Sequence, residues 1–173
     1  MQPYYILEGP PGAGKSTVLD LLADQMPVIA EPARRVLLQQ RAIGGRGTGE
    51  QDPALFIRLM RDTILDDYTF ATGPTVFDRG LPGLLAFCEY YGISSSDIRR
   101  HIKHLRYNRT VFWFPPWQDI YKTDAERQLD FEGAAQFGHL VRQSYLQSGY
   151  VLVPVPKTTP EQRAAFILNQ IAG

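Results

Sequence analysis

A glycine-rich segment near the start of the sequence constrains this chain more than any other feature. Residues 9–17 read GPPGAGKST and match the G-x-x-x-x-G-K-[ST] pattern of a phosphate-binding loop. An apolar run, Tyr4 to Leu7, precedes the glycines, and apolar residues at helical spacing follow Lys15. The segment is therefore expected to join a buried strand to a helix, which is the context that this motif requires. The sequence predicts a protein that binds a nucleoside triphosphate.

Each part of this phosphate loop (residues 9–17) has a chemical role. The glycines allow a tight turn whose N–H groups point at a phosphate, and the helix that follows adds partial positive charge. Lys15 is expected to reach the β- and γ-phosphates, and the Ser16 hydroxyl is placed to bind Mg²⁺, so ATP with Mg²⁺ is the expected ligand. The loop residues expected to bind the nucleotide are Gly9, Pro10, Pro11, Gly12, Ala13, Gly14, Lys15, Ser16 and Thr17.

The composition argues against several other classes of protein. A chain of 173 residues, 44% hydrophobic and 21% charged, is typical of one globular domain, expected here over residues 1–173. The formal net charge is zero, so no global field draws the molecule toward nucleic acid or an anionic membrane. Cys88 is the only cysteine, and the apolar stretches are shorter than the ~20 residues that cross a bilayer. A cytoplasmic protein without a membrane partner is expected.

Short apolar runs alternate with helical patterns along the whole chain. The runs that predict strands are Tyr4–Leu7, Val28–Ala30, Thr75–Phe77, Thr110–Phe114 and Tyr150–Val155. Helical crossovers between such strands predict an α/β fold with a five-stranded parallel sheet between two layers of helices. Ligands of these sheets bind at the carboxyl ends of the strands, where the phosphate loop, Glu31 and Asp78 all fall.

Local sequence signals also predict where helices begin and end. Asp52-Pro53 and Thr159-Pro160 each combine a capping side chain with a first-turn proline. Residues 94–97, SSSD, resemble a cap for a basic helix that reaches about Tyr107. The helix that follows the phosphate loop is expected to run from Lys15 to about Gln25.

Charged residues follow two of the predicted strands. Asp78 stands where proteins with this loop place an acidic residue near magnesium; the alternative is a turn aspartate that caps the next helix. Glu31 could accept a proton from a substrate hydroxyl; the alternative is a first-turn residue that favours the helix dipole. Arg34 and Arg79 are candidates for substrate binding, although Arg79 could instead hold Asp78 or Glu31 in a salt bridge.

Two later segments are candidates for closing the site. Residues 116–130 are expected to form a lid whose Lys122 and Arg127 neutralise charge on the γ-phosphate and exclude water. The alternative is an exposed, charged helix start. The loop of residues 156–159 leaves the last strand and is expected to lie against adenine through Lys157, which could instead be an ordinary turn residue.

With these residues in place, the chain resembles the P-loop nucleoside and nucleotide kinases. Residues 8–17 are similar to the first motif of deoxynucleoside and thymidylate kinases, and Glu31-Pro32 resembles the Glu-Pro that supplies a carboxylate near the attacking hydroxyl. Asp78-Arg79 stands where that group has Glu-Arg or Asp-Arg. Residues 120–127 also resemble a signature of small predicted ATPases related to nicotinamide riboside kinase. The resemblance implies strand order 2-3-1-4-5. Two features depart from the residue pattern of these kinases: Gly80 after the Asp-Arg pair, and a lid with a single arginine.

These observations predict an ATP-dependent small-molecule kinase that transfers the γ-phosphoryl group to an unidentified acceptor. The expected catalytic residues are Lys15, Glu31, Asp78 and Arg127, with Ser16 and Asp78 at the metal. One alternative is an NTPase that switches a protein partner. Another is a nucleic-acid-processing kinase that uses the basic residues between Arg99 and Arg109, although such a cluster is usually a solvated face.

Overall fold

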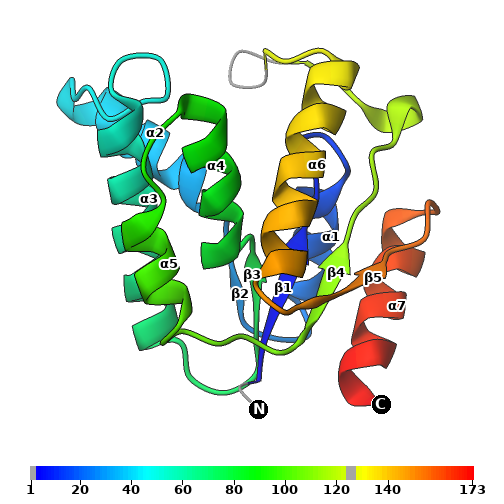
Figure 1. Ribbon diagram of the computed structural model, residues 1–173. Coiled ribbons are helices and arrows are strands. Elements are labelled where there is room, and N and C mark those ends of the chain that lie inside the picture. The colour runs from blue at the N-terminus through cyan, green and yellow to red at the C-terminus, as the bar shows by residue number, and fades with distance from the viewer. Residues whose placement is uncertain (1–2, 124–127) are drawn as a thin grey trace.

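The computed structural model describes residues 3–123 and 128–173. In this part of the chain, five parallel strands form one sheet in the order β2-β3-β1-β4-β5, which confirms the predicted architecture and strand order. Figure 1 shows the strands in the middle of the molecule with helices around them. The strands are β1 (Tyr4–Glu8), β2 (Val28–Ile29), β3 (Thr75–Asp78), β4 (Thr110–Trp113) and β5 (Val151–Pro154).

Helices connect each strand to the next. They are α1 (Lys15–Leu22), α2 (Pro32–Ile43), α3 (Pro53–Phe70), α4 (Leu84–Tyr91), α5 (Ser96–Ile102), α6 (Phe131–Gln147) and α7 (Pro160–Ala172), with short 3-10 turns η1 (Leu81–Gly83) and η2 (Gln118–Ile120). Two predicted caps are confirmed: the Asp52 carboxylate accepts a hydrogen bond from the Leu55 N–H at 2.9 Å, and the Thr159 hydroxyl accepts one from the Gln162 N–H at 3.3 Å. These helix starts depend on contacts three residues apart, which a sequence specifies directly.

The prediction for the basic helix was wrong in its end and in its cap. α5 ends at Ile102 because Tyr107 turns into the core, where its hydroxyl accepts a hydrogen bond from the Leu81 N–H at 3.3 Å. Ser95 occupies the cap position without a side-chain capping bond, and the Ser94 hydroxyl instead accepts the Ser96 N–H at 3.4 Å.

The other boundaries differ only by terminal residues. α1 stops at Leu22, three residues earlier than expected, because the Gln25 N–H bonds back to the Leu22 carbonyl in a tighter turn. The strand and helix ends that remain shift by one or two residues, which is within the usual fraying of element ends.

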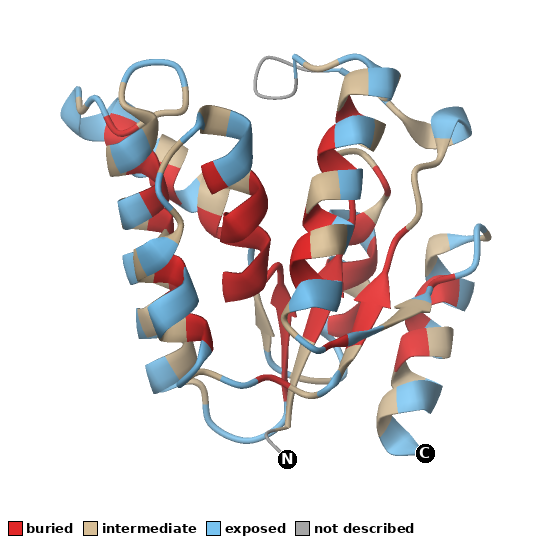
Figure 2. Cartoon of the chain, viewed as in Figure 1, coloured by how far each residue is buried: buried red, intermediate tan, exposed pale blue. Residues whose placement is uncertain are grey.

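The sheet separates two hydrophobic layers because successive strand side chains point to opposite faces. One face packs against α3, α4 and α6 through strand residues that include Ile6, Phe77 and Val111. The other packs against α1 and α7 through Leu7, Val76 and Phe112. Figure 2 shows the buried residues concentrated in the strands and on the helix sides that face them.

The strand register brings the candidate residues to one edge of the sheet. Leu7 of β1 is paired with Asp78 of β3, and Glu8 is paired with Trp113 of β4. The segments that follow β1, β2 and β3 therefore start side by side at the carboxyl edge. Within the described residues, no helix combines the length and apolar character needed to cross a membrane.

Candidate active site

The phosphate loop lies at the carboxyl end of β1, and its three glycines cannot be replaced without strain. Gly9 has φ +157°, and a Cβ there would stand 2.4 Å from the carbonyl oxygen of Phe114. Gly14 has φ +90° in the left-handed region and immediately precedes α1. The backbone therefore passes close to Phe114, just after β4, and then turns sharply into the N-terminus of α1, as an anion-binding loop requires.

The Lys15 side chain is folded inside the loop. Its Nζ donates hydrogen bonds to the carbonyl oxygens of Gly9 at 3.2 Å and Pro10 at 3.0 Å. Burial, together with the positive charge of Arg79, lowers the pKa of Lys15 to about 8. A buried cation that donates to neutral carbonyls is placed to bind an incoming phosphate, whose negative charge would offset the cost of burying the cation.

A buried network of charges lies beside the loop. The Arg79 guanidinium donates to the Glu8 carboxylate at 2.5 Å through Nη1 and to the Glu31 carboxylate at 3.0 Å through Nε. Arg79 also donates to the Gly9 carbonyl at 3.0 Å. Burial alone would lower the pKa of Arg79, but the carboxylates of Glu8, Glu31 and Asp78 raise it above its ordinary value. One arginine therefore ties the ends of β1, β2 and β3 together.

The backbone of Arg79 explains how its side chain reaches this position. Among the described residues it is the only non-glycine with a positive φ, at 74°. A left-handed non-glycine residue costs about 1–3 kcal/mol, and this one is compensated by three hydrogen bonds from its guanidinium. Gly80 follows because a Cβ there would stand 2.5 Å from Ile6 Cδ1. The departure of Gly80 from the kinase pattern thus has a packing reason.

Glu31 stands at the start of α2 and is turned toward this network. Arg34 Nε lies 3.5 Å from its second carboxylate oxygen. Burial raises the pKa of Glu31, but the positive charges of Arg79 and Lys15 outweigh it and hold that pKa below its usual range. Glu31 is therefore ionised at neutral pH. The ion pair between Arg79 and Glu31 that the alternative named is present, and a role of Arg79 toward a substrate stays a prediction.

Asp78 is buried at the end of β3, and its Oδ1 finds no hydrogen-bond partner in the described part of the chain. Burial raises the pKa of Asp78 to about 6, although Lys15 opposes the shift. A buried carboxylate oxygen without a partner beside a phosphate loop fits a role toward a divalent cation, since oxygen ligands and phosphates together hold Mg²⁺. The described residues contain no cluster of three or more metal-binding side chains that would replace such an arrangement.

The raised pKa of Asp78 gives a prediction about stability. Its pKa is 3.8 in a model peptide and about 6 in the fold, so the folded state binds more protons between these values and stability falls as the pH rises through them. Asp78→Asn should therefore raise the free energy of unfolding at pH 7.5, without Mg²⁺ or nucleotide, by about 1–3 kcal/mol. Urea denaturation at pH 7.5 and pH 4 measures the effect, which should shrink at pH 4.

The exposed Asp20 of α1 provides a matched control, because Asp20→Asn removes the same charge without a burial penalty. A destabilised Asp78→Asn protein at pH 7.5 would contradict the prediction. It would mean that the Asp78 charge is needed to balance Lys15 and Arg79.

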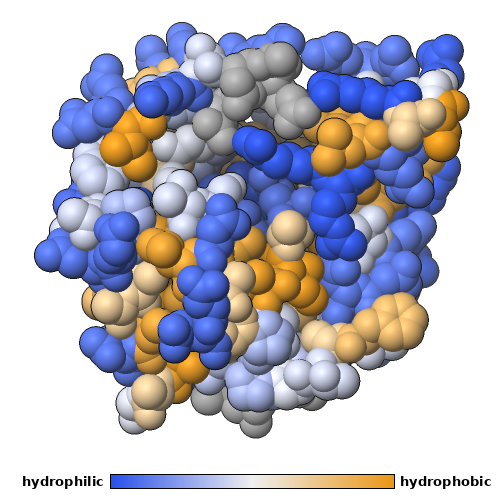
Figure 3. All heavy atoms as spheres, turned by 180° about the vertical axis from the view of Figure 1, so that it is seen from behind, coloured by the Kyte–Doolittle hydropathy of each residue, from blue (hydrophilic) through white to orange (hydrophobic). Residues whose placement is uncertain are grey.

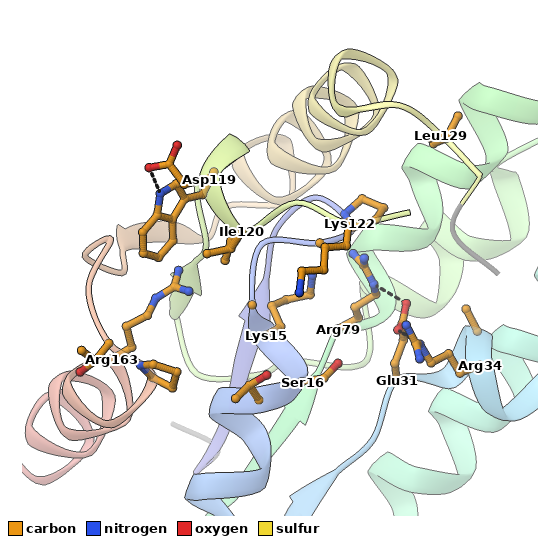
Figure 4. Close-up of a pocket in the computed structure, with 18 of the residues that line it drawn as sticks. Lys15, Ser16, Glu31, Arg34, Arg79, Asp119, Ile120, Lys122, Leu129 and Arg163 are labelled. Carbon is orange, nitrogen blue, oxygen red and sulfur yellow. Dashed lines mark hydrogen bonds and ion pairs between the residues drawn. The ribbon is translucent and has the colours of Figure 1, made fainter. Parts of the chain in front are cut away.

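Two adjoining cavities open on the carboxyl edge of the sheet. The first, about 820 Å³, is lined by the phosphate loop, Glu31, Arg34, Arg79, Lys122 and Arg163. Figure 4 shows Lys15 and Ser16 at its centre, with Glu31 and Arg34 on one side and Arg163 on the other. The second, about 1190 Å³, shares Pro11, Glu31 and Arg79 with the first. Seen from behind, the molecule is hollowed near its upper edge, and hydrophilic side chains form part of the rim of the hollow (Figure 3).

The second cavity is rich in aromatic rings. Phe87 and Phe137 meet edge to face with centroids 4.9 Å apart, and Tyr90 and Tyr91 do the same at 4.9 Å. The rings that line it are Phe56, Phe87, Tyr90, Tyr91 and Phe137. The structure places all of these rings along a cavity that also includes Glu31, and Phe56 and Phe137 are at the same time part of the buried core.

Of the other residues predicted for the site, some line one of the two cavities and some do not. In the phosphate loop, Pro11, Gly12, Gly14, Lys15, Ser16 and Thr17 line the first cavity, whereas Gly9, Pro10 and Ala13 are buried and do not. Lys122 lines the first cavity; Lys157 is exposed and lines neither, although Thr158 and Thr159 beside it line the first. Arg127 lies outside the described residues. The basic residues between Arg99 and Arg109 line neither cavity.

Sequence reasoning missed two buried charged residues of the site. Glu8 was noted only as part of the first motif, yet it is fully buried at the end of β1 and forms an ion pair with Arg79 at the centre of the charge network. Arg163 was not noted at all. A signal was present, because Arg163 precedes Ile167 by four residues and so falls on the apolar stripe of the last helix.

Comparison with known proteins agrees with this geometry. A family model described as an AAA domain (AAA_28) matches residues 4–163. No curated protein matches the chain. Among solved structures, deoxyadenosine kinase from M. mycoides, with the products dCMP and dCDP bound, is 14% identical with a TM-score of 0.67 and covers 98% of each chain.

Two further structures share the fold. The NadR protein in complex with NR is 18% identical with a TM-score of 0.70, over 98% of this chain but only 51% of the NadR chain. The YorR protein from Bacillus subtilis, in complex with phosphorylated GDP, is 14% identical with a TM-score of 0.57, over 98% of this chain and 95% of YorR. At these identities the likeness concerns the fold.

Proposed function

Since this chain belongs to the AAA domain family, and its fold is that of nucleoside kinases, we propose that it is a small-molecule kinase that phosphorylates a ring-bearing acceptor. The phosphoryl donor is a nucleoside triphosphate held by the phosphate loop. The acceptor occupies the second cavity and presents a hydroxyl or phosphate oxygen to the γ-phosphate.

One observation carries this proposal: Glu31 and Arg79 lie on the wall that the two cavities share. Lys15 and Ser16 line the first cavity only, and the aromatic rings line the second. A donor and an acceptor bound on the two sides would therefore meet at a carboxylate and a guanidinium. Enzymes gain much of their rate by holding two reactants in such an arrangement.

The donor side has the groups that phosphoryl transfer needs. Lys15 and the loop N–H groups would hold the β- and γ-phosphates, and the Ser16 hydroxyl with the buried Asp78 carboxylate would hold Mg²⁺. The metal would neutralise phosphate charge when bound. Lys122 lines the same cavity and, with Arg127 of the lid segment, would add positive charge as the segment closes.

Glu31 would act on the acceptor. Its carboxylate accepts the hydrogen bond of the acceptor hydroxyl and holds that oxygen in line with the γ-phosphorus. As the new oxygen–phosphorus bond forms, the bond to the β–γ bridging oxygen breaks and the hydroxyl proton passes to Glu31. Arg79 keeps the carboxylate oriented by the hydrogen bond at 3.0 Å. A carboxylate of low pKa is a weak base, which suits a loose transition state that needs little prior deprotonation.

The second cavity supports an acceptor with a flat ring. Aromatic walls bury such a ring and favour edge-to-face or stacked contacts. Gln40, Glu50 and Gln51 supply polar groups on the same wall for hydrogen bonds to ring substituents. The solved structures of the same fold carry ligands named dCMP and NR. We therefore place nucleosides and nucleotides first among the acceptor candidates.

The direct test is a transfer assay with γ-labelled nucleoside triphosphate across nucleosides, nucleoside monophosphates and hydroxyl-bearing vitamins. We expect label to appear in one class of acceptor, with turnover at least about 10²-fold above the rate without acceptor. Release of inorganic phosphate at the same rate with and without every acceptor would overturn the proposal in favour of an NTPase. Labelling of oligonucleotides alone would favour nucleic-acid processing.

A further inference from the structure

Arg163 is a buried cation whose hydrogen bonds are only partly satisfied. Its side chain rises from α7 toward the segment that carries Asp119 and Ile120 (Figure 4) and is 2% exposed. Nη1 donates to the Ala13 carbonyl at 2.9 Å. Nε and Nη2 have no hydrogen-bond partner within residues 3–123 and 128–173. A buried guanidinium with two idle donors is costly and points to a ligand that completes it.

The surroundings of Arg163 supply aromatic faces but no counter-charge. Its guanidinium carbon lies 4.5 Å from the centroid of Phe114 and 5.3 Å from that of Trp117. No carboxylate of the described residues forms an ion pair with it. Burial lowers the pKa of Arg163 to about 10, so the group is still charged at neutral pH. The two rings are close enough for cation–π contacts, which stabilise the charge but do not satisfy the N–H donors.

The position of Arg163 relative to the phosphate loop says which part of a nucleotide it would meet. Arg163 binds the Ala13 carbonyl, but it approaches the loop from another side than Lys15, which lies at the centre of the first cavity (Figure 4). Arg163 lines the side of the first cavity opposite Glu31 (Figure 4), and Trp117, Thr158 and Pro160 line the same cavity. With the phosphates held at Lys15 and the acceptor beyond Glu31, the base of a bound nucleotide would extend toward Arg163.

The idle nitrogens form a specific pair. Nε and Nη2 lie on the same edge of the guanidinium and donate two parallel hydrogen bonds. This fork matches two adjacent acceptors, which guanine presents at O6 and N7; adenine presents one acceptor, N7, beside the N6 amino donor. Taking the nucleoside triphosphate of the proposed function as bound in the phosphate loop, we propose that Arg163 reads the base and that the preferred donor is a guanine nucleotide rather than the ATP expected from the sequence.

Access to the fork depends on one neighbouring segment. Nε and Nη2 are closed to solvent, while Trp117 lies over the guanidinium and Ile120 packs next to Gly14. Base binding therefore requires the segment 117–120 to shift and expose the edge of Arg163. Trp117 has its own hydrogen bond, from Nε1 to Asp119 at 3.3 Å, which does not involve Arg163.

The experiment measures affinities of the full chain for Mg²⁺-bound GTP, ITP, 7-deaza-GTP and ATP by calorimetry, without acceptor. ITP keeps O6 and N7, and 7-deaza-GTP lacks N7. We expect GTP and ITP to bind roughly 10- to 100-fold more tightly than ATP, with 7-deaza-GTP between them. Arg163→Lys keeps the charge and a donor for the Ala13 carbonyl but loses the fork, so the ratio of GTP to ATP affinity should fall to near one.

The measured quantity is the ratio of GTP to ATP affinity, because Arg163 also binds the phosphate loop and its replacement can weaken the binding of every nucleotide. A purely structural role, or a contact to the α-phosphate, would lower the affinities for GTP and ATP equally in Arg163→Lys and would overturn the assignment. Equal affinities in the wild-type protein would overturn it as well and leave the proposed kinase function standing. If the wild-type protein bound no nucleoside triphosphate, both proposals would fall. Arg58→Lys, at an exposed site on α3, controls for the substitution itself.

Discussion

Replacement of Lys15 by alanine should lower the affinity for a Mg²⁺-bound nucleoside triphosphate by about 100-fold or more. Lys15 is the cation at the centre of the first cavity, and burial has already removed its hydration. Two charge-assisted hydrogen bonds to phosphate oxygens would be lost in a site of low dielectric, where each is worth more than in water. Calorimetric titration of wild type and variant with a non-hydrolysable triphosphate analogue measures the change.

The fold should survive this substitution, because Lys15 Nζ bonds, within residues 3–123 and 128–173, only to the carbonyls of Gly9 and Pro10, and those groups can bind water instead. Circular dichroism and urea denaturation establish that the variant is folded. Lys103→Ala, at an exposed site just after α5, is the matched control and should bind nucleotide normally. A folded Lys15→Ala protein with unchanged affinity would show that the phosphate loop does not hold the triphosphate.

The parts of this site that the sequence predicted are those encoded over a few residues. The phosphate loop, the Asp52 cap and the Thr159 cap each depend on groups within one or two turns of one another. The strand order was predicted through the kinase resemblance, since alternating strands and helices alone allow several orders of a parallel sheet. The local sequence therefore specifies the loop and the caps, whereas the strand order came from the resemblance.

The parts that were missed depend on contacts between distant segments. Arg79 meets Glu8 across 71 positions of the chain, and Arg163 meets Ala13 across 150. Neither pairing leaves a local pattern, because each results from the register of parallel strands and from helices that return to the same edge. The left-handed backbone of Arg79 was equally hidden, since a glycine follows at Gly80 and would have been the expected place for it.

Because its charged groups interact, the charge network gives the carboxylates of Glu31 and Asp78 different pKa values. Lys15, Arg79 and Arg34 lie close to Glu8, Glu31 and Asp78, and the neighbouring charges shift the pKa values of Lys15, Glu31 and Asp78. Glu31 is kept ionised by the cations, whereas Asp78, deeper and without a hydrogen bond to its Oδ1, has a pKa raised to about 6. Carboxylates whose environments push their pKa values apart are suited to different tasks. Glu31 thus fits the acceptor side and Asp78 the metal side.

Glu31→Gln is the substitution that separates these tasks. Glutamine keeps the size of the side chain and one oxygen for Arg79, but it cannot take the proton of an acceptor hydroxyl. The rate of phosphoryl transfer at saturating substrates should therefore fall by about 10²- to 10⁴-fold. Affinity for the nucleoside triphosphate should change by less than about threefold, because Glu31 is assigned to the acceptor side of the shared wall. Single-turnover transfer and calorimetry on the same protein give the two numbers.

Glu50→Gln makes the control, because Glu50 lines the second cavity but has no contact with the charge network among the described residues. It should alter acceptor affinity without lowering the rate at saturation. If Glu31→Gln instead lost nucleotide binding and kept its turnover per bound nucleotide, Glu31 would belong to the donor side. Equal losses in both variants would mean that the cavity needs negative charge in general. A selective loss of transfer in Glu31→Gln alone is the result that places this carboxylate on the reacting hydroxyl.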